Sequence, residues 1–163
     1  MVAEFRLLGD FEVYVADRVV DAGHDRQQCV LAVLLIEANR VVSAAELIDR
    51  VWGEQRLPAH PRNALQTYIS LLRRALAMAG GVSIDRQSPG YKLTVDAGVI
   101  DMHRFGELIG QAQGSDDARA VALLDQALGL WRGVPFANLD TPWINSVRSM
   151  LADELISDEL VVG

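Results

Sequence analysis

Apolar and polar positions alternate in the first part of the chain, which is the pattern of short β-strands. The segment "FEVYV" (residues 11–15) has an apolar side chain at every second position, as expected for a strand that buries one face. The pairs Gly9-Asp10 and Ala16-Asp17 are typical of turns and interrupt this pattern. We therefore expect a small antiparallel sheet over residues 4–23.

A helical period follows this sheet. Residues 25–40, "DRQQCVLAVLLIEANR", are apolar at so many positions that they predict a mostly buried helix, with Asp25 as its N-cap and Asn39 near its end. The single cysteine, Cys29, lies inside this apolar run. We interpret it as a small buried hydrophobic residue and not as a reactive thiol.

A short amphipathic helix is predicted next, in "SAAELIDRVWGE" (residues 43–54). Ser43 and Glu46 have the spacing of a capping box, and Gly53 is suited to end the helix. The apolar residues of one side are Leu47, Ile48, Val51 and Trp52.

The segment from Pro61 to about Ala79 predicts a longer helix with two distinct faces. Pro61 suits the first helical position because the N–H that it lacks would have no partner there. The apolar stripe consists of Leu65, Ile69, Leu72 and Leu76. At 100° per residue, the opposite face consists of Asn63, Gln66, Thr67, Ser70 and Arg74, with Arg73 at its edge.

A β-hairpin with basic residues is predicted after Gly80-Gly81. The segments "VSIDRQ" and "YKLTV" flank the turn residues Ser88-Pro89-Gly90, and Arg86 and Lys92 are expected near its tip. Tyr68 and Tyr91 are interpreted as core residues and not as platforms for stacking bases.

This order of elements predicts an α+β winged helix-turn-helix, with the longer helix in the major groove of DNA and the hairpin on the backbone or the neighbouring minor groove. The candidate DNA-binding residues are Arg62, Asn63, Gln66, Thr67, Ser70, Arg73, Arg74, Arg86, Ser88 and Lys92. The pattern leaves open which of them contact bases and which contact phosphates, although glutamine is suited to adenine.

The remainder of the chain predicts helices only. Three segments have helical periodicity: residues 102–113, 117–133 and 142–160. Asp116 and Asp117 open the second segment and Pro142 opens the third. Stacked helix pairs need about three repeats for stability, so we expect a longer natural protein that continues beyond residue 163.

The net charge of −7 is unevenly distributed. Residues 1–57 carry six arginines against ten acidic residues, and residues 93–163 carry four arginines against eleven. Residues 58–92 carry five basic residues against Asp85 alone, a local charge of +4. A positive segment within an acidic protein is expected when one face of the molecule binds phosphates.

Other kinds of chemistry find no support in the sequence. His24, His60 and His103 are far apart and lack metal-ligand spacing, so we predict no metal and no cofactor. Phosphate-binding loops, serine-hydrolase motifs and zinc-protease motifs are missing, which argues against an enzyme. With no apolar run of about 18 residues and no secretory signal, we expect a cytoplasmic protein without a membrane partner.

Several motifs in the same order resemble the Streptomyces antibiotic regulatory proteins (SARPs). They are "AAELIDRVWGE", the proline-containing loop, "ALQTYISLLRRAL", "GYKL", "IDMHRF" and "RAVALLDQALGLWRG". The resemblance spans nearly the whole chain. It implies an OmpR-type winged helix over residues 1–98, followed by the first part of a TPR-like bacterial transcriptional activation domain over residues 99–163. One position departs from the family, whose members commonly have Arg or Lys where this chain has Leu71.

The resemblance also implies a function, that of a transcriptional activator. Such a protein binds direct repeats in double-stranded DNA near the promoters of antibiotic biosynthesis genes. It then recruits RNA polymerase, including its sigma factor. The candidate polymerase-facing residues are the acidic tail and, in the loop between the two helices of the motif, Glu54, Gln55, Arg56 and His60. Because no heptad repeat offers a dimer seam, we expect a monomer in solution and copies side by side on DNA.

An interaction module is the alternative hypothesis. In it, TPR-like helices bind a protein partner and the chain has no specific affinity for DNA. This would account for residues 101–163, but not for the polar helix face or the basic hairpin. Retention on DNA that weakens steeply with salt distinguishes the two hypotheses.

Overall fold

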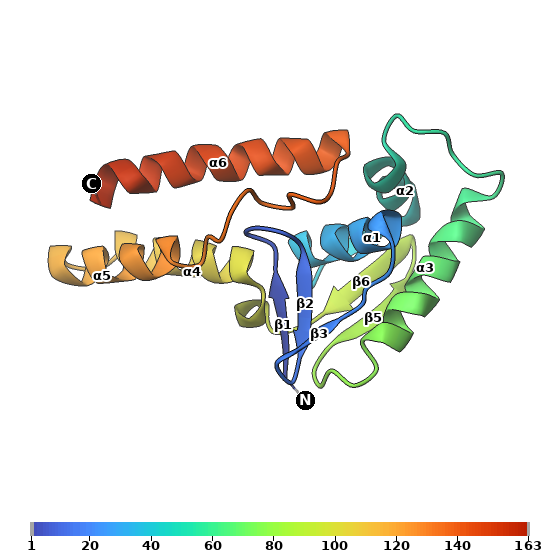
Figure 1. Cartoon of the computed structure of the whole chain (residues 1–163), viewed down its shortest axis with the longest axis horizontal. Coiled ribbons are helices and arrows are strands. Elements are labelled where there is room, and N and C mark those ends of the chain that lie inside the picture. Colours follow the sequence, from blue (N-terminus) through green and yellow to red (C-terminus); the bar gives the residue numbers. More distant parts are fainter. Residues whose placement is uncertain (1, 163) are drawn as a thin grey trace.

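Two small sheets and a set of helices make up the computed structural model, which describes residues 2–162, with side chains through residue 157. The strands are β1 (Ala3–Arg6), β2 (Glu12–Val15), β3 (Arg18–Val20), β4 (Val41–Ser43), β5 (Ser83–Gln87) and β6 (Gly90–Thr94). The helices are α1 (Asp25–Ile36), α2 (Ala44–Trp52), α3 (Pro61–Ala75), η1 (Ala97–Val99, a 3-10 turn), α4 (Asp101–Gln113), α5 (Asp117–Leu128) and α6 (Pro142–Val162). Figure 1 shows their arrangement.

The first sheet confirms the expected antiparallel meander, in the order β1-β2-β3. Ala16 and Asp17 form its second turn with φ angles of 51° and 64°, and Val15 pairs with Arg18. Two consecutive residues of positive φ make the turn whose twist matches antiparallel strands. The sheet buries alternate side chains of β1 and β2, as the sequence pattern indicates.

Helix α1 is the buried helix that its apolar run predicts, and Val30 to Leu35 are fully inaccessible to solvent. Its predicted N-cap is wrong by one residue. His24 has the extended backbone of an N-cap and makes no side-chain capping bond, while Asp25 is already helical. The Asp25 carboxylate, in the first turn, still lies where the helix dipole favours negative charge.

The capping box of α2 is confirmed. The backbone N–H of Glu46 donates to Ser43 Oγ at 3.0 Å, and Ser43 Oγ donates to the Glu46 carboxylate at 3.1 Å. Gly53 ends the helix with a φ of 57°. The sequence pattern missed β4, just before α2, because three residues are too short to show a period. β4 pairs with β6, so the second sheet has the order β4-β6-β5.

Helix α3 begins at Pro61, as predicted, but ends at Ala75 and not near Ala79. After Ala75 the backbone closes tighter turns, in which Ala77 N donates to Arg74 O and Ala79 N donates to Leu76 O. The apolar period continues through these turns because Leu76 and Ala79 are still buried. The helix prediction was too long because it followed the spacing of apolar residues, which continues to Ala79, whereas the helical hydrogen bonds end near Ala75.

The C-terminal helices differ from expectation mainly at the end of α5, which stops at Leu128 and not at residue 133. Residues 129–141, which we call the strap, leave the helix and pass along the loop between β1 and β2: Arg132 N donates to Leu8 O and Phe136 N to Leu7 O. Arg148 of α6 donates to carbonyl oxygens of Pro135, Phe136 and Leu139 and so holds the strap from its other side.

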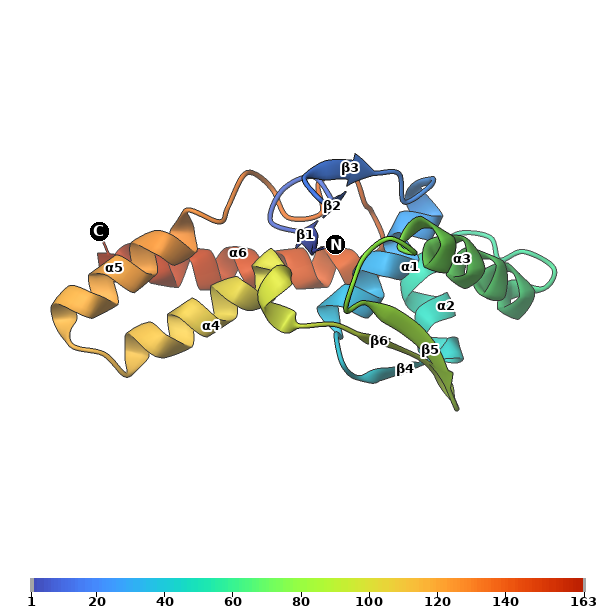
Figure 2. The same ribbon diagram turned by 90° about the horizontal axis from the view of Figure 1, so that it is seen from below.

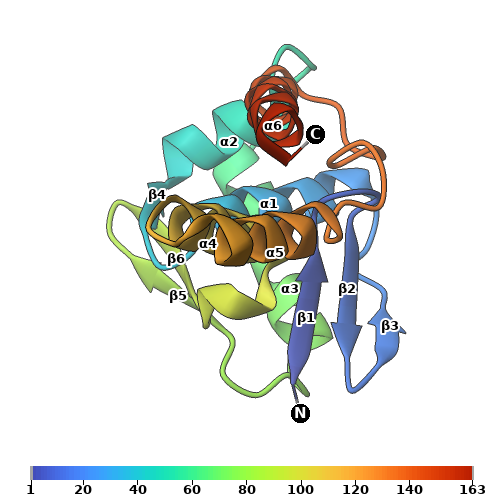
Figure 3. The ribbon, with the colours of Figure 1, turned by 90° about the vertical axis from the view of Figure 1, so that its left-hand side faces the viewer.

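The molecule is elongated, with α3 and the β5–β6 hairpin at one end and the α4–α5 pair at the other (Figure 1). Helices α4 and α5 lie side by side as an antiparallel pair next to α6 (Figure 2). Viewed along its length, the molecule has α6 above this pair and the first sheet beside it (Figure 3). One continuous cluster of buried residues runs through all these elements.

Candidate nucleic-acid interface

Helix α3 presents the polar face that its sequence predicts. Leu65, Ile69 and Leu72 are buried against α1 and α2. The outward side chains Asn63, Thr67, Ser70 and Arg74 are all exposed. Gln66 is exposed too, but it lies on the flank of α3 that faces the hairpin and not on the outward face where its sequence position was expected to put it. Leu71 lies at the edge of this face and is 39% exposed, an apolar side chain among polar ones. The arrangement offers hydrogen-bond donors and acceptors on a helix able to enter a major groove.

Arg73 points to the hairpin and not to the outward face. Its Nε donates to the carbonyl oxygen of Ile84 in β5 at 2.8 Å. This bond occupies one guanidinium nitrogen in joining α3 to the hairpin. Arg73 therefore has a structural contact that its position at the edge of the helical face did not reveal.

The aromatic residues near α3 belong to the core, as predicted. Tyr91 is buried, and Tyr68 packs edge-on against His24 with ring centroids 5.2 Å apart. Trp52 stacks on the other side of Tyr68 at 6.0 Å and is itself buried. Tyr91 is thus part of the core, and Tyr68 is half-buried and packed against it.

The hairpin separates the two basic residues that were expected together at its tip. Gln87 pairs with Gly90, Arg86 with Tyr91, and Asp85 with Lys92. Directly paired residues point to the same side of a sheet and successive residues to opposite sides. Arg86 is therefore on the side of Tyr91, facing α3, whereas Lys92 lies one pair farther from the turn, on the opposite side beside Asp85. Both basic residues thus lie close to the turn, as expected, but their side chains are on opposite sides of the hairpin.

The turn of this hairpin is fixed against the start of α2. Ala44 N donates to Pro89 O at 3.1 Å. Gly90 passes so close to β4 that a Cβ atom there would be 1.9 Å from Val42 O. Only glycine allows this approach, and the approach holds the hairpin tip in one position relative to α2 and α3.

A recess of about 330 Å³ lies between the first turns of α3 and the hairpin turn. Its polar side chains come from both elements: Arg62 and Gln66 from α3, Arg86 and Ser88 from the hairpin. Its floor includes Ala44, Leu65 and Tyr91. Within residues 2–157, no hydrogen bond or ion pair engages the side chains of these four polar residues. The fold thus unites candidates that are separated by more than 20 residues in sequence.

The loop between α2 and α3 is exposed along most of its length. Glu54, Gln55, Arg56 and His60 are all accessible, and Gln55 Oε1 accepts a hydrogen bond from Arg26 at 2.5 Å. Leu57 is 49% exposed in the same loop. Of the predicted acidic tail, Asp153 is exposed, while the side chains of Asp158 and Glu159 lie outside the described residues.

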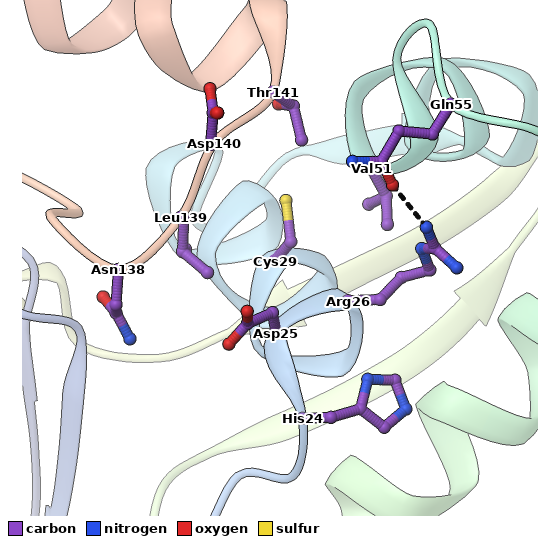
Figure 4. Close-up of a pocket in the computed structure, with 10 residues that line it drawn as sticks. All are labelled: His24, Asp25, Arg26, Cys29, Val51, Gln55, Asn138, Leu139, Asp140 and Thr141. Atoms are coloured by element: carbon purple, nitrogen blue, oxygen red, sulfur yellow. Dashed lines mark hydrogen bonds between the residues drawn. The ribbon is translucent and has the colours of Figure 1, made fainter.

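A second recess, of about 510 Å³, lies where the strap meets α1 and α2. Figure 4 shows its lining, which includes Asp25, Arg26 and Cys29 from α1 and Asn138, Asp140 and Thr141 from the strap; Arg26 extends toward Gln55. Burial raises the pKa of the Cys29 thiol to about 12, so the thiolate is scarce at neutral pH. This agrees with the interpretation of Cys29 as a buried hydrophobic residue.

Sequence analysis missed the side chains that join the C-terminal helices to the first sheet. Asp101 Oδ1 accepts from Leu7 N at 2.7 Å, and its Oδ2 accepts from Leu8 N at 3.0 Å. Arg132 pairs with Glu12 at 2.8 Å, and Asn138 Oδ1 accepts from Phe11 N at 2.9 Å. These partners are 93 to 127 residues apart, and no local pattern marks such contacts. Burial raises the pKa of Asp101, although its hydrogen bonds oppose this effect.

Two further kinds of feature are missing from the described residues. Among them, no group of three or more histidine, cysteine, aspartate or glutamate side chains is placed to hold a metal ion. None of the helices described is long and apolar enough to cross a membrane.

Comparison with known proteins identifies two domains. Residues 12–93 match the family model for "Transcriptional regulatory protein, C terminal", and residues 100–157 match that for "Bacterial transcriptional activator domain". "Transcriptional regulatory protein MoaR1" of Mycobacterium tuberculosis is 34% identical over 173 positions, covering 98% of this chain and 52% of the relative. "Regulatory protein AfsR" of Streptomyces griseus is 29% identical over 153 positions, covering 91% of this chain and 15% of the relative.

A solved structure has the same architecture. Mycobacterium tuberculosis EmbR, determined in complex with a low-affinity phosphopeptide, superposes with a TM-score of 0.85 at 28% sequence identity. The superposition covers 96% of this chain and 43% of that one. The chain thus spans about half, or less, of the length of these relatives.

Proposed function

Because the chain belongs to the SARP family of regulators, with an OmpR-type domain followed by a bacterial transcriptional activator domain, we propose that it is a sequence-specific DNA-binding activator of transcription. The two domains would divide at residues 98 and 99. The regulated genes would belong to a secondary-metabolite pathway, such as antibiotic biosynthesis, and the protein would act in the cytoplasm.

The observation that carries this proposal is the clustering of positive charge around α3. Residues 58–92 have a net charge of +4 in a protein whose total charge is −7. Arg62, Arg74 and Arg86 are exposed on α3 and the hairpin, without an ion pair to any residue of the described part. A duplex lying against this end of the molecule would meet positive charge, and the acidic remainder would face away from it.

The contacts to DNA would form two groups, according to the direction in which each side chain points. Asn63, Thr67, Ser70 and Arg74 point away from the core and would reach base edges or phosphates in the major groove. Arg62, Gln66, Arg86 and Ser88 converge on the recess beside the hairpin. Arg73 and Lys92 would add longer-range attraction to the phosphates.

Activation would require a surface that stays accessible when DNA is bound. The loop with Glu54, Gln55, Arg56 and His60 is exposed at one end of α3, and we propose that it contacts RNA polymerase with its sigma factor. The acidic tail is a second candidate because its charge does not suit DNA. The chain would be a monomer in solution, with copies side by side on direct repeats.

The competing hypothesis is an adaptor whose helices bind a protein partner without specific DNA binding. This hypothesis gives no role to the exposed arginines Arg62 and Arg74 of α3 and Arg86 of the hairpin. Catalysis is not proposed for any group of residues described here.

Footprinting of the chain on genomic fragments tests the proposal, followed by binding to the protected duplex over a series of salt concentrations. We expect protection of direct repeats and affinity that falls steeply with salt. The variant Arg62→Ala/Arg74→Ala should lose most of this binding. The control Arg40→Ala/Arg119→Ala removes the same charge from exposed residues elsewhere and should bind almost normally. Equal loss in both variants would contradict a defined DNA-binding face.

A further inference from the structure

The recess between α3 and the hairpin carries a more specific inference, which rests on the proposed function. We propose that it is a pocket for a single backbone phosphate of the DNA, bound simultaneously by Arg62 of α3 and Arg86 of the hairpin. Gln66 and Ser88 would complete the set of hydrogen-bond donors. One phosphate would thereby link the helix in the major groove to the hairpin beside it.

The chemistry of the lining selects a phosphate. Two guanidinium groups, one amide and one hydroxyl line the recess, and no carboxylate is among its lining residues. The acidic residue nearest in the hairpin, Asp85, pairs with Lys92 and so points to the opposite side of the sheet. Two arginines facing one site would repel each other unless an anion lies between them, and planar guanidinium groups match phosphate oxygens well.

Position distinguishes this pocket from the base-reading face. Arg62 and Gln66 lie on the flank of α3 that faces the hairpin, about 100° around the helix axis from Thr67 and Arg74. Side chains on that flank approach the strand that borders the groove, whereas the outward face enters the groove itself. A phosphate is therefore the group within reach of both arginines.

The pocket is already formed in the isolated chain. The Arg73–Ile84 bond ties the last turn of α3 to β5, and the Ala44–Pro89 bond ties the hairpin turn to the start of α2. Gly90 keeps β6 in close contact with β4. Because these contacts hold both walls before DNA arrives, binding would need only side-chain adjustment of Arg62 and Arg86.

If two arginines share one phosphate, the effects of replacing them on DNA affinity should not be additive, and this can be measured. Arg62→Ala, Arg86→Ala and the double variant are compared for binding to the footprinted duplex by fluorescence anisotropy over a series of potassium chloride concentrations. We expect each single variant to lose about tenfold in affinity, as for a charge-assisted hydrogen bond. The double variant should lose much less than the product of the two losses.

The salt dependence gives an independent measure. Each phosphate neutralised contributes about 0.9 to the slope of log K against log salt. The double variant should therefore flatten the slope by about one. If the two arginines instead bound two separate phosphates, the double variant should flatten the slope by nearly two. Lys92→Ala is the matched control, since it removes one positive charge from the opposite side of the same hairpin; its effect should be additive with that of Arg86→Ala.

Replacement of single phosphates by neutral methylphosphonates then locates the contact. One linkage per half-site should weaken binding of the unaltered chain, and this effect should vanish in both Arg62→Ala and Arg86→Ala but persist in Lys92→Ala. Additive losses, a slope change near two, or different sensitive linkages for the two arginines would overturn the shared pocket while leaving DNA binding intact. Failure of the unaltered chain to bind any duplex would instead refute the proposed function.

Discussion

At the scale of single residues, Arg74 is the α3 side chain best placed to read a base. It lies on the outward face, opposite the buried Ile69 and Leu72, and no ion pair holds it within the described residues. A bidentate contact of arginine with guanine discriminates between bases by about 1–3 kcal/mol. We expect Arg74→Ala to weaken binding to the operator by that amount and to bind random DNA with little change, as measured by gel shift.

Arg119→Ala is the control for this prediction, because it removes an exposed arginine from α5 at the far end of the molecule. It should leave the gel shift unchanged. If Arg74→Ala weakens operator and random DNA equally, Arg74 contacts a phosphate and another residue of the outward face reads the base.

Asp101 is a second residue with a defined individual contribution. Its carboxylate accepts the N–H groups of Leu7 and Leu8, and no other described acceptor is assigned to them. Asparagine has one amide oxygen, so Asp101→Asn would leave one buried N–H group without an acceptor. We expect a loss of about 2 kcal/mol in the free energy of unfolding, measured by urea denaturation. An unchanged midpoint and slope would contradict this.

The same residue predicts the sign of a pH effect. Because burial raises the pKa of Asp101, the folded chain binds this proton more tightly than the unfolded chain does. As pH rises from below the ordinary carboxyl pKa through the raised one, the free energy of unfolding of the natural chain should fall relative to that of Asp101→Asn. Parallel pH profiles for the two proteins would show that Asp101 has an ordinary pKa.

At the scale of elements, the β5–β6 hairpin depends on its crossing with β4. An alanine at position 90 would place Cβ against Val42 O, a backbone atom that cannot rotate away. We expect Gly90→Ala to lower the free energy of unfolding by about 1–3 kcal/mol and to weaken DNA binding by displacing the hairpin. Thermal unfolding and anisotropy measure the two effects.

Gly106→Ala is the control at this scale. Gly106 is an exposed residue inside α4, and a Cβ atom there would have no neighbour within 4 Å. Alanine should stabilise the helix by up to about 1 kcal/mol. A Gly90→Ala variant as stable as Gly106→Ala would show that the hairpin can shift without cost.

At the scale of the whole molecule, hydrogen bonds and a cation–π contact join the two domains. The N–H and C=O groups of Leu7 and Leu8 all bond to Asp101 or to the strap, and Arg50 of α2 lies over the ring of Trp143 in α6 at 4.3 Å. The orientation of α3 on DNA would therefore fix the direction in which α4, α5 and α6 project.

Copies on direct repeats would contact one another only in the correct rotational phase. Half-sites about one helical turn apart, 10–11 bp, place both copies on the same side of the duplex. Insertion of about half a turn should abolish cooperative binding, and insertion of a full turn should restore part of it, as measured by footprint titration. Cooperativity that is independent of spacing, or a stable dimer in solution, would contradict this arrangement.

Interactions within one segment were readable from the sequence alone. The caps of α2 and α5, the start of α3 at Pro61 and the polar outward face of α3 all depend on residues a few positions apart. For such features, helical and strand periods determine which side chains share a face. The polar, exposed face of α3 was predictable for this reason, and so was the winged helix-turn-helix that presents it.

Only the tertiary structure decided which distant residues meet. Arg62 and Arg86 share a recess, and Lys92 is turned away from it, because β6 pairs in one particular register between β4 and β5. A shift of that register by one residue would exchange the two sides of the hairpin. The bonds of Asp101 to Leu7 and Leu8 likewise depend on how the two domains pack. Such contacts depend on how all the helices and strands pack together, so no local sequence pattern indicates them.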